Sequence, residues 1–84
     1  MTDVPEGWAE DGDAITKTFE FADFAAAIAF MNRAAGPIDE MNHHPEWTNV
    51  YNRVDVRLTS HDTGAVTDRD LRLAAVLDDL AQQS

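Results

Sequence analysis

Hydrophobic and polar residues alternate along two stretches of the chain, a spacing typical of half-buried β-strands. In residues 14–21, Ile15 and Phe19 fall on one side of an extended backbone and threonines on the other. In residues 50–59, valines and a leucine alternate with charged residues and threonine. We predict a strand in each stretch, the second one long and solvated on one face. Residues 1–13 are acidic and rich in glycine and proline, so we predict a loop there with Trp8 as its large apolar anchor.

Between these strands, apolar residues recur every three or four positions, which is the period of an amphipathic helix. They are Phe24, Ala27, Ile28, Met31 and Ala35. Asp23 is suited to cap the first turn, and Gly36-Pro37 interrupts the pattern because Pro37 has no backbone N–H. We predict a helix that packs on the sheet and ends or kinks at this dipeptide, with helix resuming over residues 38–42.

A second helical pattern follows a predicted turn at residues 61–64 and continues to the C-terminus. Its apolar positions are Val66, Leu73, Val76, Leu77 and Leu80. Thr67 and Asp70 have the spacing of a capping box at its start. Amphipathic strands and helices in mixed order predict one domain over residues 1–84 with an α+β fold, in which helices cover one face of an antiparallel sheet.

The charge of the chain and its lack of cysteine exclude several classes of function. Sixteen acidic and six basic residues give a formal charge of −10, which would repel the phosphates of a nucleic acid. Without cysteine there are no disulfides, thiolate metal sites or cysteine nucleophiles. No segment has the pattern of a membrane span or a signal peptide. We expect a cytoplasmic protein with no nucleic-acid or membrane partner.

Candidate chemistry is concentrated in three histidines at element boundaries, His43, His44 and His61. Imidazole titrates near ~6.5, so these side chains suit proton transfer at neutral pH without a metal. A zinc site that also uses Asp62 is a second interpretation, although an adjacent pair fits one tetrahedral ion poorly and the HxxxH spacing is absent. A third interpretation is that all three are surface histidines without a function.

The segment around the histidine pair resembles a family signature. It reads Asn42-His43-His44-Pro45-Glu46-Trp47-Thr48-Asn49-Val50-Tyr51-Asn52 and is similar to the NHHPEW…VYN signature of the pterin-4a-carbinolamine dehydratases. Three further segments resemble the same family: the F-x-F-x-x-F passage at 19–24, the strand and Thr-His-Asp/Glu turn at 54–62, and the start of the last helix at 66–74. Together the similarity covers about residues 7 to 80.

This resemblance implies an antiparallel four-stranded sheet covered on one face by helices, assembled into a homodimer or homotetramer. It also implies a reaction, the loss of water from a 4a-hydroxytetrahydropterin, which recycles the tetrahydrobiopterin-type cofactor of aromatic amino-acid hydroxylases. The catalytic histidines of the family correspond to His43, His44 and His61. By that correspondence, His43 and His61 form the acid–base pair and His44 mainly holds the substrate. The reaction needs no metal and no cofactor.

The resemblance further implies which residues line the substrate pocket. Besides His44, they are Trp8, Asn42, Pro45, Ser60 and Asp62. The chain departs from the family pattern at two places. Only seven residues precede Trp8, so we expect the family's additional N-terminal helix to be missing and self-association to be needed for stability. A kink at Gly36-Pro37 would displace His43.

A non-catalytic role is the alternative to the enzyme. Animal members of the family also act as dimerisation cofactors for a homeodomain transcription factor, so a module that binds pterin or a protein partner is conceivable. The presence of all three histidines favours catalysis, since an interaction module does not need them.

Overall fold

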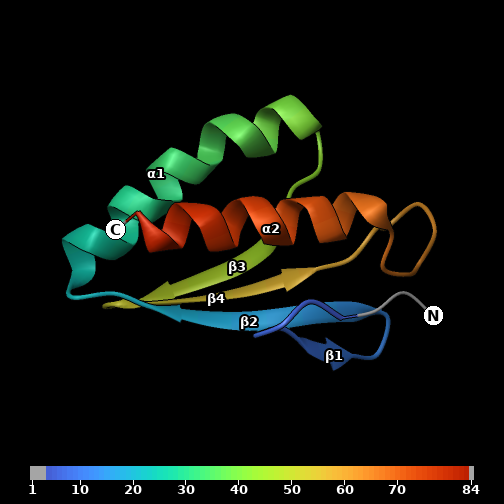
Figure 1. Cartoon of the computed structure of the whole chain (residues 1–84), viewed down its shortest axis with the longest axis horizontal. Helices are drawn as coiled ribbons and strands as arrows, with labels where there is room; N and C mark the ends of the chain where they lie inside the picture. Colours follow the sequence, from blue (N-terminus) through green and yellow to red (C-terminus); the bar gives the residue numbers. More distant parts are fainter. Residues whose placement is uncertain (1–3, 84) are drawn as a thin grey trace.

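The computed structural model describes residues 4–83, which form a four-stranded sheet and two helices. The strands are β1 (Ala9–Asp11), β2 (Ala14–Glu20), β3 (Glu46–Val50) and β4 (Arg53–Leu58), and the helices are α1 (Phe24–Met41) and α2 (Asp68–Gln82). The strand order is β1-β2-β4-β3, and all neighbours are antiparallel. Both helices lie on the same face of the sheet (Figure 1). The predicted α+β fold and its four-stranded antiparallel sheet are confirmed.

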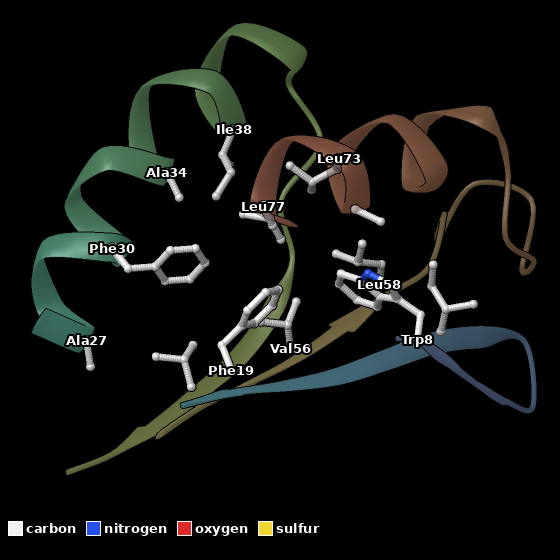
Figure 2. Packing of buried hydrophobic residues seen from close by; sticks show 13 residues of the cluster. Trp8, Phe19, Ala27, Phe30, Ala34, Ile38, Val56, Leu58, Leu73 and Leu77 are labelled. Atoms are coloured by element: carbon white, nitrogen blue, oxygen red, sulfur yellow. The ribbon is translucent and has the colours of Figure 1, made fainter. Parts of the chain in front are cut away.

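The hydrophobic core fills the space between this face of the sheet and the helices (Figure 2). Alternate residues of β2 and β4 point into it, and Phe19 packs on Phe30 of α1 with ring centroids 5.1 Å apart. Trp8 is 7 % exposed and is the anchor predicted for the N-terminal segment. In the described part of the chain, no helix is long and apolar enough to span a membrane.

The stretch predicted as one long strand is two strands joined by a tight turn. Val50 ends β3 and pairs directly with Arg53 of β4, which leaves Tyr51 and Asn52 as the turn. Tyr51 takes a left-handed backbone (φ 52°), and the Asn49 side chain donates to the carbonyls of Tyr51 and Arg53 at 3.2 and 2.9 Å. No glycine marks this turn, and the alternation continues across it, so the pattern predicted a single strand.

The predicted N-terminal loop is also partly wrong, because β1 lies within it. The three residues of β1 are all exposed at the edge of the sheet, and none is a large apolar residue. The period-2 pattern that reveals a half-buried strand is therefore absent from this segment.

Helix α1 faces the core with a stripe that only partly matches the predicted one, in which Ala27 is buried and Met31 is half-buried. The buried positions are Ala27, Phe30, Ala34 and Ile38. Phe24 is instead 51 % exposed, and Ala35 is exposed. Residues 24–31 are all apolar, so several stripes at helical spacing fit the pattern equally well. The stripe with the large Phe30 side chain is the one that packs, because its burial removes the most apolar surface from water.

Helix α1 continues through Gly36-Pro37 to Met41, so the helix does not end at this dipeptide, and the helix predicted over residues 38–42 is present as far as Met41. Proline inside a helix costs about 3 kcal/mol, because one hydrogen bond is lost and the ring clashes with the carbonyl four residues earlier. Ile38 follows directly and is only 4 % exposed, and burying such a side chain contributes about 1.5–3 kcal/mol. The burial of Ile38 thus offsets much of the cost and keeps the last turn helical.

Both predicted helix starts are confirmed. The Asp23 side chain accepts a hydrogen bond from the backbone N–H of Ala26 at 2.8 Å, and α2 begins with a capping box between Thr67 and Asp70. The predicted turn at 61–64 is also present, closed by the Gly64 N–H donating to the Ser60 carbonyl at 2.8 Å.

Candidate active site

The three histidines border one depression at the ends of several elements. His43 and His44 lie between α1 and β3, and His61 follows β4. The depression has a volume of about 540 Å³ and is lined by Asn42, His43, His44, Pro45, Glu46, Thr59, His61, Asp62 and Arg69. Residues far apart in the sequence are thus brought together, and six of the predicted site residues are among them.

The end of α1 determines where His43 lies. Asn42 takes a left-handed backbone (φ 50°) and ends the helix. The N–H of His43 then donates to the carbonyl of Ile38 at 3.4 Å, the bond typical of a Schellman helix end. This turn brings the imidazole to α2, where Nε2 lies 2.5 Å from Oδ1 of Asp70. His43 is 8 % exposed and Asp70 is completely buried.

Asp70 is held by two further donors. Its Oδ2 accepts hydrogen bonds from the Ser60 hydroxyl and from the Thr67 backbone N–H, both at 2.9 Å. The N3 residue of the α2 capping box is therefore also the carboxylate that orients His43. A buried carboxylate with this many partners fixes the direction and the tautomer of an imidazole, as a general acid or base requires.

His44 and His61 are far more exposed than His43. The side chain of His44 is 59 % exposed, with Nε2 3.1 Å from the carboxylate of Asp39. The side chain of His61 is 76 % exposed, with Nε2 3.6 Å from the carboxylate of Glu46. Each histidine thus faces a carboxylate, but only the His43–Asp70 pair is protected from water. Of the adjacent pair, His43 thus turns inward and His44 lies at the exposed edge of the depression.

Asp62 and Arg69 form an ion pair on the rim of the depression, with Arg69 NH2 2.7 Å from Asp62 Oδ1. The hydrogen bond from the Arg69 guanidinium holds the pKa of the Asp62 carboxyl below its usual value. The rim therefore retains a carboxylate charge even in moderately acidic solution.

Two predicted site residues do not line the depression. Ser60 is 1 % exposed and contributes to the site indirectly, because its hydroxyl donates a hydrogen bond to Asp70. Trp8 packs against Phe19 in the core, and its indole N–H donates to the carboxylate of Asp78 at 3.1 Å. Direct contact of Trp8 with a substrate stays a prediction.

Four residues of the site were not predicted from the sequence: Asp70 as the partner of His43, and Glu46, Thr59 and Arg69 as lining residues. Asp70 was identified only as a helix cap. Its one signal in the sequence is that a capping box usually has glutamate or glutamine at this position, whereas the shorter aspartate stands here.

The geometry suits proton transfer. A buried, oriented imidazole and a second, exposed imidazole border the same depression, so one group is available to donate a proton and another to accept one. Within residues 4–83, no group of three or more histidine, aspartate or glutamate side chains is arranged to hold a metal ion.

Comparison with known proteins places the chain in a family. Residues 1–80 match the sequence profile described as pterin 4 alpha carbinolamine dehydratase. Proteins with the provisional name pterin-4-alpha-carbinolamine dehydratase from Rhizobium meliloti and Sinorhizobium medicae are each 52 % identical over 79 residues. These alignments cover 92 % of this chain and 76 % and 75 % of the two relatives.

Two solved structures have a fold similar to that of this chain. A transcriptional coactivator/pterin dehydratase from Brucella melitensis superposes with a TM-score of 0.88 at 42 % identity, covering 90 % of this chain and 83 % of that one. A pterin dehydratase-like protein described as a RuBisCO assembly factor in the alpha-carboxysome superposes with a TM-score of 0.73 at 23 % identity, covering 88 % and 86 % of the two chains. The second likeness concerns the fold alone. The profile match and the identity to the rhizobial relatives show that the chain belongs to the pterin-4-alpha-carbinolamine dehydratase family.

Proposed function

We propose that this protein is a dehydratase that removes water from a 4a-hydroxytetrahydropterin and releases the quinonoid dihydropterin. The observation that carries the proposal is the single depression bordered by His43, His44 and His61, in a chain of this family. The product returns to the tetrahydropterin after reduction, so the reaction recycles a tetrahydrobiopterin-type cofactor. Self-association into a homodimer or homotetramer and a cytoplasmic location stay predictions.

The reaction consists of two proton transfers and one bond cleavage. The C4a–O bond breaks, the departing hydroxyl takes a proton from an acid and leaves as water, and the N5 proton passes to a base as the C4a=N5 double bond forms. We assign the acid–base pair to His43 and His61 and the holding of the ring mainly to His44. The orientation of His43 by the buried Asp70 supports this assignment.

Dehydration of chemically generated 4a-hydroxytetrahydropterin tests the proposal. The purified protein is expected to accelerate water loss over buffer, and His43→Ala and His61→Ala are each expected to slow it by roughly 10²- to 10⁴-fold. His44→Ala is expected to raise KM more than it lowers kcat. Activity is expected to be unchanged in excess chelator.

His43→Ala leaves the buried Asp70 without its imidazole, so the fold of this variant needs a check. His43→Gln keeps a polar partner for that carboxylate and serves as the matched variant, with thermal unfolding measured for both. A dehydration rate equal to that in buffer, or one that neither histidine variant changes, would contradict the enzymatic proposal and favour the non-catalytic alternative.

A further inference from the structure

Glu46 lies between the histidine depression and a second depression, and it lines both. Its oxygen Oε2 is 3.6 Å from Nε2 of His61 and 3.4 Å from NH1 of Arg57. One carboxylate oxygen thus connects an imidazole of the site with a guanidinium on the sheet.

Arg57 is itself held in place. It pairs with Glu46 in the β3–β4 register, so the two opposite charges face each other directly across neighbouring strands. Its other contacts are with Asp13 in the β1–β2 turn, 3.4 Å from the guanidinium, and with Asp11 at the end of β1, 3.9 Å from it. The hydroxyl of Thr59 donates to the backbone carbonyl of Asp13 at 2.7 Å, which attaches the same turn to the end of β4 just before His61.

We propose that Glu46, held by Arg57, is a positioning residue for His61. This inference rests on the proposed dehydratase function. A carboxylate that faces Nε2 favours the neutral imidazole tautomer with its proton on Nε2, which leaves Nδ1 as the nitrogen that accepts a proton from the substrate or returns one to it.

The exposure of His61 explains why such a partner is needed. With 76 % of its side chain exposed, the ring has little packing to hold it in one rotamer. Contact with Glu46 restricts the ring, so the reacting nitrogen spends more of its time in a productive direction. The separation of 3.6 Å is longer than a hydrogen bond, and contacts of this kind commonly shorten when the substrate binds.

Glu46→Gln is the first test, because it keeps the shape of the side chain and removes its charge. We expect kcat to fall roughly two- to fivefold, the range for an exposed ion pair, with KM changed less than twofold. Arg57→Gln is expected to change kcat in the same direction by a smaller factor. Arg53→Gln is the matched control, because Arg53 is also on β4 and contacts Asp55 at 3.5 Å but does not line the histidine depression.

A double-variant cycle shows whether Glu46 acts through His61. In a His61→Ala background, Glu46→Gln is expected to cause no further loss of kcat, since its target is absent. A further loss by the same factor as in the wild type would mean that Glu46 acts on the substrate or on the fold, and would overturn the proposal.

The ring nitrogens of His61 give a readout that does not need activity. In ¹⁵N NMR spectra of the free protein, at a pH where the imidazole is neutral, we expect the Nε2–H tautomer in the wild type and in Arg53→Gln. Glu46→Gln should shift the ring toward a mixture of tautomers. If that shift occurs in a protein without dehydratase activity, the proposed function fails and the positioning of His61 stands. If the protein is active and Glu46→Gln matches Arg53→Gln in both kcat and nitrogen shifts, the positioning role fails and the function stands.

Discussion

The buried side chain of Asp70 has two tasks: one oxygen contacts His43, and the other holds the start of α2. Oδ1 faces His43 at 2.5 Å, while Oδ2 accepts from the Ser60 hydroxyl and the Thr67 N–H at 2.9 Å each. In Asp70→Asn, an NH₂ group replaces one of these oxygens and at least one partner loses its acceptor. We expect the free energy of unfolding to fall by about 1–3 kcal/mol, measured in urea, and kcat to fall as His43 loses its fixed orientation.

Ser60→Ala separates the two tasks of Asp70. It removes one donor and leaves the His43 contact in place, so stability is expected to fall by about 1 kcal/mol while kcat falls less than in Asp70→Asn. Equal losses of kcat in the two variants would contradict the orienting role of Asp70.

At the scale of an element, α1 contains a glycine directly before its proline. Gly36 is exposed, its φ is not positive, and an added Cβ would meet nothing within 4 Å outside its two chain neighbours. One of these neighbours is Pro37, whose ring disfavours the helical conformation for a preceding residue that has a Cβ. Gly36→Ala is therefore expected to leave the free energy of unfolding nearly unchanged, because this clash offsets the roughly 0.5–1 kcal/mol that alanine saves in backbone entropy.

Gly12 is the matched control for Gly36, because an added Cβ there also meets nothing within 4 Å, but its φ is +61° in the turn between β1 and β2. Gly12→Ala should lower stability, since alanine disfavours a left-handed backbone. The same chemical change thus has different expected effects at the two positions, and urea unfolding that gave an equal loss for both would contradict the helical argument.

Most element types could be predicted from the sequence, but two kinds of feature could not. The turn at Tyr51 and Asn52 depends on side-chain hydrogen bonds, among them the one from Asn49, in place of a glycine, and no local pattern reveals it. The passage of α1 through Pro37 depends on the burial of Ile38 against other elements. In the case of Pro37, tertiary contacts override a local signal.

The candidate site likewise has residues that the sequence reveals and residues that only the fold brings into place. The histidines were found because their residue type and the signature around them are visible in the sequence. The partners of His43 and His61 lie 27 and 15 positions away (Asp70 and Glu46), and only the fold brings them together. Sequence reasoning therefore identified the three histidines but not the carboxylates that face His43 and His61.

At the scale of the whole molecule, the charge of −10 is the dominant electrostatic feature. The molecule measures 35 × 24 × 18 Å. At an ionic strength of 0.01 M the Debye length is about 30 Å, so the acidic side chains repel one another across the entire molecule. At 0.15 M it is about 8 Å, and repulsion between distant charges is largely screened.

The ion pairs respond differently to salt because their charges are much closer together. Lys17–Asp78 and Arg69–Asp62 are separated by only 2.7 Å, well inside the Debye length at either ionic strength. Added NaCl therefore weakens the long-range repulsion more than it weakens these attractions, and we expect the melting temperature at pH 7 to rise between 0.01 and 0.15 M salt. A gain of about 1 kcal/mol in the free energy of unfolding would raise the melting temperature by roughly 4–8 °C in a domain of this size.

Choline chloride should raise the melting temperature equally if screening is the cause, whereas a rise with NaCl alone would indicate sodium binding. A melting temperature that falls with either salt would mean that the ion pairs outweigh the repulsion.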